Sequence, residues 1–455
     1  MRRSGKEWLK FTAARFCGLA VDSFTLGVAY LAAILLRFDL QAPRWGWRAV
    51  AMSFVAVCGV HLVALVACGC YRLSWRRTHM ADLPRYFLAT FVACVVLTLL
   101  RFLTAVETYA HVRPPYSVTL MCFILASLAL VSWRIVWSWL WAAHVDENAL
   151  LERKVRRMDA QAAARFFSGK TVMVTGAGGS IGSEIVRQVA GFGPKAVLLV
   201  ERGENALYEI DREMRATSPK GSALVPLMKD VNDVEAMKAI LDEYRPEIIL
   251  HAAAYKHVPM VEMNPEEGYR NNTEATRKLA ELAQGHGVRR FVLISTDKAV
   301  NPVSVMGKTK REAEKAIMAM PEAGTSFCAV RFGNVLGSSG SVVPLFREQI
   351  ARKQPLTVTH PDMKRYFMTI PEAVGLVLQA ASRTEKAIYT LDMGSPVRIV
   401  DLAEQMIRQA GYKPYVDIPI VFTGIRPGEK LFEELDVSEK SAYKTDMARI
   451  YITKA

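Results

Sequence analysis

Four long apolar runs in the first 145 residues limit what this chain can fold into more than any other feature. They extend over residues 16–36, 49–70, 86–105 and 117–141. Each approaches or exceeds the roughly 20 residues that a helix needs to cross a bilayer. We therefore predict four transmembrane helices in residues 1–145. We expect the first to stay in the protein, because it is long for a signal peptide and no small-residue cleavage site follows it.

The basic residues predict how these helices are oriented. Lys and Arg cluster before the first run, between the second and third, and after the fourth, which places both termini in the cytoplasm and the spans in the inner membrane. Arg37, Arg44 and Arg48 in the first outer loop run against this rule. Residues 1–165 hold 20 Lys and Arg against 9 Asp and Glu, which is most of the net charge of +14. This distribution favours anionic lipid head groups as a partner and argues against nucleic acid.

Polar residues inside the apolar runs have two interpretations. Asp22 and Arg101 either pair within the helix bundle or extend to the membrane interface, which we favour, or mark an ion path. Six of the seven cysteines lie in or next to the runs and are expected to pack as apolar residues. We predict no disulfide and no metal site.

The pattern changes after residue 168, where short apolar strands alternate with amphipathic helices. Such alternation predicts an α/β fold with a doubly wound parallel sheet. We therefore expect a cytoplasmic linker helix over residues 146–168 and a nucleotide-binding Rossmann domain over 169–339. Residues 340–455 contain many prolines between short elements and are expected to form a smaller substrate-binding lobe interleaved with the Rossmann domain.

A glycine-rich turn follows the first of these strands. Gly176, Gly179 and Gly182 open a helix, a pattern that lets backbone amides approach a pyrophosphate. Glu201 ends the next strand, where a carboxylate holds an adenosine ribose hydroxyl in NAD-binding proteins. Arg202 beside it keeps NADP as the alternative. Asp230 and Val231, after the third strand, are placed to meet the adenine.

A second cluster follows the strand at residues 290–296. Thr296, Asp297 and Lys298 come at the carboxyl edge of the sheet, where open α/β folds bind ligands. An acid and an amine side by side indicate a proton donor and a base, with a surface ion pair as the alternative. Met306 stands at the position where short-chain dehydrogenases keep a tyrosine, and Lys310 lies one helical turn after it. We read His251 and His257 as loop residues that line the cofactor pocket.

Six motifs give the chain a strong resemblance to a known family. They are GAGGSIGSEIVRQ (176–188), HAAAYKHVPMVE (251–262), STDKAVNP (295–302), RFGNVLGSSGSVVPLF (331–346), HPDMKRYFMTIPEA (360–373) and RPGEKLFEEL (426–435). The chain resembles the CapD/WbpM/PglF-type membrane-bound nucleotide-sugar 4,6-dehydratases, which are extended short-chain dehydrogenases. The membrane-bound branch is similar to this chain in carrying methionine at the position of Met306.

The resemblance implies a lyase that converts UDP-N-acetylglucosamine, or a related UDP-N-acetylhexosamine, to a UDP-4-keto-6-deoxy sugar. It implies that Asp297 is the acid at the C6 oxygen, that Lys298 is the base at C5, and that Thr296 orients the C4 hydroxyl. Because Met306 cannot accept a proton, Lys310 is our first candidate for that role at C4 and Lys298 the second. Further residues are expected to bind the cofactor or the substrate. For NAD they are Ser180, Ile181, Ala252, Ala253 and Lys310. For the UDP-sugar they are Lys256, Asn334, Arg365, Arg426 and Glu429.

The expected cofactor is tightly bound NAD that is recycled in each turnover. The expected partners are the bilayer, a second copy of the chain and a membrane glycosyl-phosphate transferase. Two other functions stay open at this point. One is a 4- or 5-epimerase of a UDP- or polyprenyl-linked sugar, and the other is a catalytically silent NAD-binding scaffold.

Overall fold

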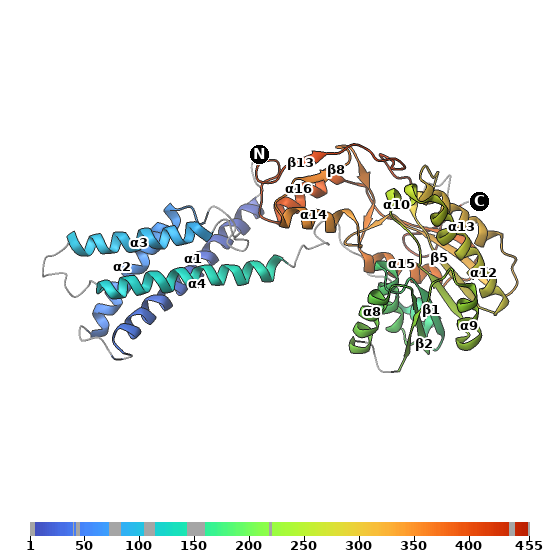
Figure 1. Ribbon diagram of the computed structural model, residues 1–455, viewed down its shortest axis with the longest axis horizontal. Coiled ribbons are helices and arrows are strands. Elements are labelled where there is room, and N and C mark those ends of the chain that lie inside the picture. The colour runs from blue at the N-terminus through green and yellow to red at the C-terminus, as the bar shows by residue number, and fades with distance from the viewer. Residues whose placement is uncertain are drawn as a thin grey trace. The chain divides into compact units, whose positions relative to one another are not determined.

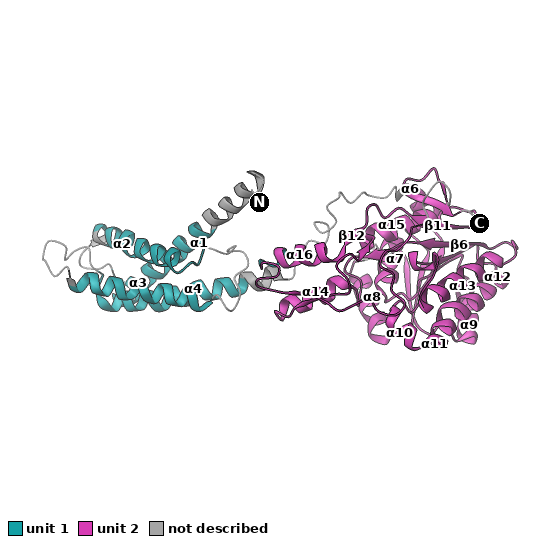
Figure 2. Ribbon diagram, turned by 90° about the horizontal axis from the view of Figure 1, so that it is seen from above, with its two compact units in different colours: residues 1–145, 409–411 teal, residues 146–408, 412–455 magenta. Residues whose placement is uncertain are grey.

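The computed structural model describes residues 5–39, 41, 46–71, 83–103, 114–142, 160–217, 221–435 and 442–453. The chain divides into two compact units, residues 1–145 with 409–411 and residues 146–408 with 412–455 (Figure 2). Residues 146–159 of the predicted linker helix lie outside the described residues.

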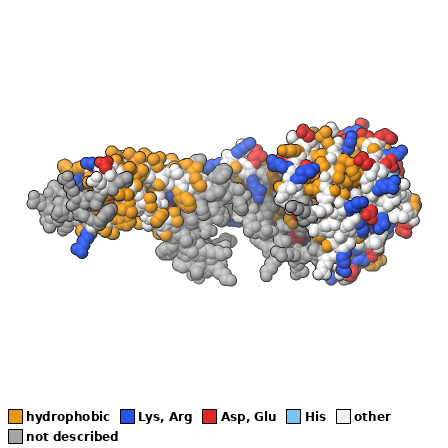
Figure 3. Space-filling view, turned by 90° about the horizontal axis from the view of Figure 1, so that it is seen from below, with side chains coloured by type: hydrophobic (Ala, Val, Ile, Leu, Met, Phe, Trp, Pro, Cys, Tyr) orange, Lys and Arg blue, Asp and Glu red, His pale blue; other side chains and the backbone are white. Residues whose placement is uncertain are grey.

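The first unit is a bundle of four long helices (Figure 1). They are α1 (Gly5–Arg37), α2 (Gly46–Ala67), α3 (Leu83–Leu103) and α4 (Tyr116–Ala142). By length and composition, all four can cross a membrane. Apolar side chains cover the described surface of the bundle in Figure 3, with Phe24 and Phe102 more than 70% exposed. Small residues such as Ala33, Ala89 and Ala93 are fully buried between the helices, which lets the backbones approach closely.

A buried ion pair joins the first and last helices of the bundle. Arg134 of α4 donates to both carboxylate oxygens of Asp22 in α1, at 2.8 and 2.7 Å. The hydroxyl of Tyr71 donates to the same carboxylate at 2.6 Å, and the Arg134 guanidinium lies 3.8 Å from the centre of the Tyr86 ring. Arg101 donates to the carbonyl of Pro114 at 2.5 Å. The interpretation that we favoured is therefore confirmed for Asp22, which pairs within the bundle, whereas Arg101 bonds a backbone carbonyl just before α4.

The second unit is built on a sheet of nine strands in the order β14-β15-β11-β6-β5-β4-β1-β2-β3. Every neighbouring pair is parallel except those that involve β15. The strands are β1 (Thr171–Thr175), β2 (Ala196–Glu201), β3 (Ala223–Met228), β4 (Ile248–His251), β5 (Arg290–Ile294), β6 (Ser326–Arg331), β11 (Ala387–Leu391), β14 (Ala442–Lys444) and β15 (Ile450–Thr453). The predicted doubly wound sheet is confirmed, and its strand order reverses between β1 and β4, which is where such folds bind dinucleotides.

Helices cover both faces of this sheet (Figure 1). One face packs against α6 (Ala160–Phe167), α7 (Ser180–Ala190), α8 (Glu204–Thr217) and α15 (Ile370–Ala381). The other packs against α9 (Val234–Tyr244), α12 (Ala275–Gly285) and α13 (Val305–Ala319). Phe167 of α6 is fully buried in the first core. The end of the segment that we predicted as a linker therefore belongs to the core of this unit.

Shorter elements complete the second unit. Strands β11, β14 and β15 come from residues 340–455 and extend the large sheet, while the other strands of that range take part in small two-stranded sheets. The short elements are α10 (Val258–Met263), α11 (Pro265–Tyr269), η4 (Arg270–Glu274), η5 (Asp297–Ala299), β7 (Asn334–Val335), α14 (Val342–Ala351), β8 (Leu356–Val358), β9 (Lys364–Arg365), β10 (Phe367–Met368), β12 (Val397–Arg398), α16 (Ile399–Gln409) and β13 (Ile420–Phe422).

The Asp22–Arg134 pair gives a prediction about the bundle. Asp22→Ala leaves the Arg134 guanidinium buried without its carboxylate, which costs about 3–5 kcal/mol of unfolding free energy. Asp39→Asn removes an exposed negative charge near the end of α1 and suits its left-handed backbone, φ +49°, so it should change stability by less than about 0.5 kcal/mol. Thermal unfolding of the full chain in detergent measures both.

A double variant separates loss of the pair from loss of one partner. Asp22→Leu combined with Arg134→Met should be less destabilising than Asp22→Ala alone, because no unpaired charge is left behind. Equal melting temperatures for Asp22→Ala and wild type would contradict this interpretation of the pair.

Candidate functional site

The glycine turn after β1 leaves no room for a side chain at Gly176 or Gly182. Gly176 has φ +67°, and a Cβ on it would lie 2.8 Å from the backbone nitrogen of Ala253. A Cβ on Gly182 would lie 1.9 Å from the carbonyl oxygen of Gly176. Helix α7 begins at Ser180 directly after Gly179, so its first amides face the turn. This geometry leaves bare backbone amides at a helix N-terminus, as a pyrophosphate requires.

The carboxylate of Glu201 braces this turn. It accepts hydrogen bonds from the amide of Gly178 at 3.1 Å and from the amide of Gly203 at 3.0 Å. Arg202 lies over the Tyr255 ring at 4.8 Å and 3.7 Å from the carboxylate of Asp230. Val231 is 7% exposed. The glycine turn and the carboxylate beside it therefore have the composition and packing that suit a dinucleotide, although Glu201 already bonds two amides.

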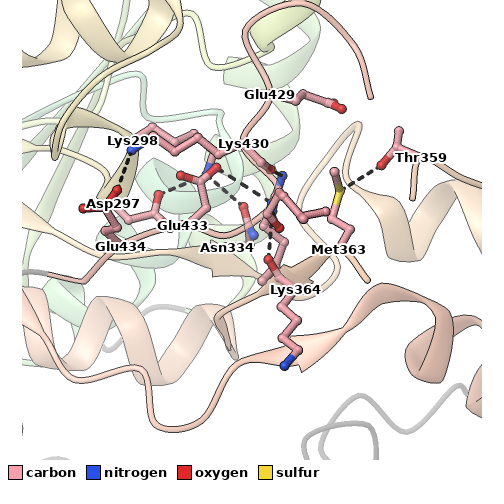
Figure 4. A network of polar contacts seen from close by, with 12 residues as sticks. Asp297, Lys298, Asn334, Thr359, Met363, Lys364, Glu429, Lys430, Glu433 and Glu434 are labelled. Carbon is pink, nitrogen blue, oxygen red and sulfur yellow. Dashed lines mark hydrogen bonds and ion pairs between the residues drawn. The ribbon is translucent and has the colours of Figure 1, made fainter. Parts of the chain in front are cut away.

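The carboxyl end of β5 brings the predicted acid and base together (Figure 4). The Nζ of Lys298 donates to Asp297 Oδ1 at 3.0 Å and to the side-chain oxygen of Asn334 at 3.3 Å. The Thr296 hydroxyl donates to the same Asp297 oxygen at 2.9 Å. Asp297 Oδ2 is buried and has no hydrogen-bond partner among the described residues. A Cβ on Gly333 would lie 3.1 Å from that oxygen, so the backbone packs closely against it.

Glu433 is a second carboxylate near Lys298, and the sequence analysis did not single it out. Glu433 Oε1 is 3.8 Å from Lys298 Nζ and 3.8 Å from Arg365 Nε. Burial raises the pKa of the Glu433 carboxyl, and the negative charge of Asp297 adds to that effect. Arg365 donates to the carbonyls of Lys364, Leu431 and Lys430. Its guanidinium is thus bonded to protein groups, and its predicted contact with substrate stays a prediction.

Helix α13 carries the other two candidate residues. It is capped by Ser304, whose hydroxyl accepts the amide of Gly307 at 3.0 Å. Met306 and Lys310 are 3% and 4% exposed. Within the described ranges, no hydrogen bond or salt bridge engages the Lys310 amine. Burial lowers the pKa of Lys310 to about 8, against the opposing charge of Glu314.

A buried ion pair fixes this helix against the sheet. Arg331, at the end of β6, donates to both oxygens of Glu314 in α13 at 2.8 and 2.7 Å. The Ser295 hydroxyl donates to Glu314 at 2.6 Å. Both Glu314 and Arg331 are at most 5% exposed. The contacts join α13, β5 and β6 at the sheet edge that carries Thr296 to Lys298.

A π-helical turn, η4, is hydrogen-bonded to helix α13. Asn272 in this turn accepts the amide of Tyr255 at 2.8 Å and donates to Thr309 of α13 at 3.1 Å. Thr273 donates to the carbonyl of Thr309 at 2.8 Å. Such turns often occur at functional sites. The sequence analysis did not reveal this turn, because a π-turn has no simple sequence pattern.

The remaining predicted residues are less closely engaged. Burial lowers the pKa of Lys256. Arg426 and Glu429 lie in an exposed loop, where the Arg426 amide donates to Glu429 at 3.4 Å. His251 does not line a pocket as expected. It lies within β4, 1% exposed, and its ring bonds the hydroxyls of Thr175 and Thr276 at 2.7 and 2.9 Å. Among the described residues, no group of His, Cys, Asp and Glu is arranged to hold a metal ion.

Comparison with known proteins identifies the family. Residues 172–455 match the model of a family described as polysaccharide biosynthesis protein. The chain belongs to this family. It is 52% identical over 294 residues to the capsular polysaccharide biosynthesis protein CapD of Staphylococcus aureus, covering 64% of this chain and 49% of that protein. The resemblance to CapD-type proteins is thus confirmed, although the chain spans only about half the length of this relative.

Two further relatives carry enzyme names. A UDP-N-acetylglucosamine 4,6-dehydratase (inverting) of Campylobacter jejuni is 29% identical over 291 residues, covering 63% of this chain and 83% of that protein. A UDP-glucose 4-epimerase of Rickettsia akari is 31% identical over 290 residues, with the same coverage of 63% and 83%. These two relatives are named for nucleotide-sugar dehydratase and epimerase activities.

Solved structures agree on the fold. The structure of Pen from Bacillus thuringiensis has a TM-score of 0.58 and 31% identity, covering 64% of this chain and 90% of that chain. The dTDP-glucose 4,6-dehydratase DesIV from Streptomyces venezuelae, solved with NAD bound, has a TM-score of 0.52 and 21% identity, covering 58% and 88%.

The close approach of Gly182 to Gly176 gives a stability prediction. Gly182→Ala places a methyl group where the Gly176 carbonyl lies, so the turn must shift at a cost of about 1–3 kcal/mol. Gly285→Ala, at the end of α12, meets no atom within 4 Å and serves as the matched control. We expect a lower melting temperature only for Gly182→Ala. Equal melting of the two variants would contradict the tight turn.

Proposed function

We propose that the chain is a membrane-anchored, NAD-dependent 4,6-dehydratase that converts UDP-N-acetylglucosamine, or a closely related UDP-N-acetylhexosamine, to a UDP-4-keto-6-deoxy sugar. The observation that carries this proposal is the buried, unpartnered oxygen of Asp297 beside Lys298. A dehydratase needs an acid at the C6 oxygen and a base at C5. The similarity to the Campylobacter jejuni dehydratase supports the same reaction.

The glycine turn and Glu201 would hold the cofactor. NAD, when bound, supplies the chemistry that removes hydride from C4 and returns it to C6. The amides around Gly176, Gly179, Ser180, Ile181 and Gly182 would bind the pyrophosphate. Glu201 favours NAD over NADP because its carboxylate repels a 2′-phosphate, and Asp230, 3.7 Å from Arg202, adds a second negative charge there.

The proton steps fall to residues of β5 and α13. Lys310 takes the proton of the C4 hydroxyl, because burial favours its neutral amine. Lys298 then takes the C5 proton, which the new ketone has made acidic. Asp297 gives its proton to the C6 oxygen, which leaves as water. Thr296, hydrogen-bonded to Asp297, orients the C4 hydroxyl.

The substrate contacts are part of the same proposal. Asn334 lies next to Lys298 and would contact the sugar. Lys256 and Arg426 supply cations for the diphosphate, and arginine suits phosphate because its planar fork offers paired donors. Arg365 and Glu429 would complete the substrate site.

The proposal extends to the cellular setting. The spans would anchor the enzyme in the inner membrane with the catalytic unit in the cytoplasm, where nucleotide sugars are available. A second copy of the chain and a membrane glycosyl-phosphate transferase are the proposed partners. The product would supply polysaccharide or glycan assembly.

Epimerization is the second candidate, because the Rickettsia akari relative is named a UDP-glucose 4-epimerase. An epimerase at C4 needs no acid at the C6 oxygen. The buried Asp297–Lys298 pair favours the dehydratase for this reason.

The first test follows the sugar directly. The detergent-purified full chain is incubated with UDP-N-acetylglucosamine in deuterated buffer without added cofactor, and proton NMR records the product. We expect a C6 methyl group and deuterium at C5. Inversion at C4 with the C6 hydroxyl retained would instead establish the epimerase. Unchanged substrate, also with added NAD and with UDP-N-acetylgalactosamine, would refute both.

Lys310 gives a pH-dependent prediction. If its neutral amine accepts the C4 proton, the single-turnover rate of C4 oxidation should rise with pH and level off above about 8. Lys310→Met should slow this step by about 100-fold and remove the pH dependence. Rapid mixing with substrate, followed by the absorbance of reduced nicotinamide, measures the rate.

Lys308→Met is the matched control, because Lys308 is exposed on the same helix. The bound NAD of each variant is quantified first. A Lys310→Met protein that holds NAD and oxidizes C4 at the wild-type rate would transfer this role to Lys298.

A further inference from the structure

Glu433 is held firmly beside the acid–base pair. It is 8% exposed and belongs to the segment that follows the RPGEK motif. Arg365 donates to the carbonyls of Leu431 and Lys430 at 3.1 and 2.8 Å, and the amide of Lys364 donates to Leu431 at 3.3 Å. Strand β9 therefore fixes the backbone that carries Glu433.

Lys298 thus lies near two carboxylates, those of Asp297 and Glu433, which Figure 4 labels. Its ammonium is hydrogen-bonded to Asp297 at 3.0 Å and lies 3.8 Å from Glu433. A movement of about 1 Å by the flexible lysine side chain would bring it to hydrogen-bonding distance of Glu433. The two carboxylates are close enough to influence each other's ionization.

The ion pair between Lys298 and Asp297 poses a problem for dehydration. A neighbouring ammonium favours the ionized form of a carboxyl, whereas the acid at C6 must be protonated. A lysine that stays protonated also cannot accept the C5 proton. A second carboxylate that can both bind the ammonium and accept its proton resolves both difficulties.

We propose that Glu433 is a positioning residue that acts through Lys298, binding its ammonium while Asp297 is protonated and accepting its proton when Lys298 takes the proton from C5. This inference rests on the proposed dehydratase function. It makes Asp297 and Glu433 a carboxylate pair that shares one proton across the lysine, as close carboxylates do elsewhere.

The proton balance of this step is closed. Before elimination Asp297 is protonated, Lys298 is an ammonium and Glu433 is a carboxylate. The C5 proton moves to Lys298 as a lysine proton moves to Glu433, and the C5–H electron pair forms the C5–C6 double bond. The C6–O bond breaks, and its oxygen leaves as water with the Asp297 proton. Afterwards Asp297 is the carboxylate, Glu433 is protonated, and the charge of the three groups is unchanged.

The surroundings of Glu433 fit a group that changes its protonation. Burial and the charge of Asp297 raise its pKa, while Lys298, Arg365 and Lys430 oppose that rise. In the structure Lys298 is bonded to Asp297, and Glu433 lies 3.8 Å from the Lys298 ammonium.

The test compares two neighbouring carboxylates. Glu433→Gln preserves the shape of the side chain but cannot accept a proton, and Glu433→Asp restores the carboxyl. Glu434→Gln is the matched control, because Glu434 bonds Asn301 and Lys430 on the exposed side at 2.9 and 3.3 Å. The full chain in detergent is mixed with UDP-N-acetylglucosamine, and both reduced nicotinamide and the C6 methyl product are followed.

We expect Glu433→Gln to oxidize C4 at the wild-type rate but to form the methyl product about 100-fold more slowly, so that reduced nicotinamide accumulates. Glu433→Asp should recover part of the rate, and Glu434→Gln should match wild type. Product formation by Glu433→Gln at the wild-type rate would overturn the proposal. An equal loss of both steps would also overturn it, because that result indicates a purely structural role.

A measurement without substrate keeps the inference separate from the proposed function. Because the pKa of Glu433 is raised in the folded protein, its contribution to stability is present at low pH and is lost as pH rises through the folded value. The melting temperature of Glu433→Gln minus that of wild type should therefore increase as the pH rises above 4.5, the ordinary pKa of a glutamate. A constant difference would refute the shared proton. If wild type dehydrates no UDP-sugar, the proposed function fails, and this comparison still decides whether Glu433 exchanges a proton in the folded chain.

Discussion

The buried ion pair between Glu314 and Arg331 is the contact on which the rest of the candidate site depends. It ties helix α13 to the ends of β5 and β6, and the Ser295 hydroxyl gives the carboxylate a third hydrogen bond. A buried pair is tolerated when its hydrogen-bonding groups are satisfied, and it then specifies one arrangement. Lys310 lies one helical turn before Glu314, so the pair sets its place relative to Asp297 and Lys298.

The other end of α13 is fixed by a second carboxylate. Glu262 accepts the amide of Val305, the first residue of the helix, at 2.7 Å. Gly428 packs against the same side chain, where a Cβ would lie 2.6 Å from a Glu262 carboxylate oxygen. The RPGEK loop thus touches the residue that holds the N-terminus of α13, while its continuation places Glu433 beside Lys298. One C-terminal segment meets both parts of the site.

The sequence predicts features that depend on local pattern. The four apolar runs, the strand at Thr171–Thr175 and the turn at Gly176 follow from composition, periodicity and spacing, and all three are found. The adjacency of Asp297 and Lys298 is visible in the same way. Contacts with residues that are distant in the sequence are not visible in such patterns. Asp22 forms its ion pair with Arg134 of the fourth helix, which is distant in the sequence.

Charged residues show the same limit inside the catalytic unit. Arg365 was expected to bind substrate, yet its donors meet backbone carbonyls of a segment that no periodicity relates to it. Glu433 and Glu434 are adjacent and chemically identical in the sequence. Only the fold directs one toward Lys298 and the other toward Asn301. His251 was expected in a loop, but it ends β4, and the hydroxyls of Thr175 and Thr276 that bond its ring come from β1 and α12.

The two lysines of the site illustrate how one side chain can be prepared for different tasks. Lys310 is buried, and the described residues offer its amine no hydrogen-bond acceptor, so the neutral form is favoured and the group can accept a proton at the start of a cycle. Lys298 has acceptors in Asp297 and Asn334, with Glu433 nearby. A hydrogen-bonded ammonium is a poor base by itself, but it can transfer protons between two carboxylates. The difference comes from the surroundings, because an exposed lysine would be protonated at neutral pH in either place.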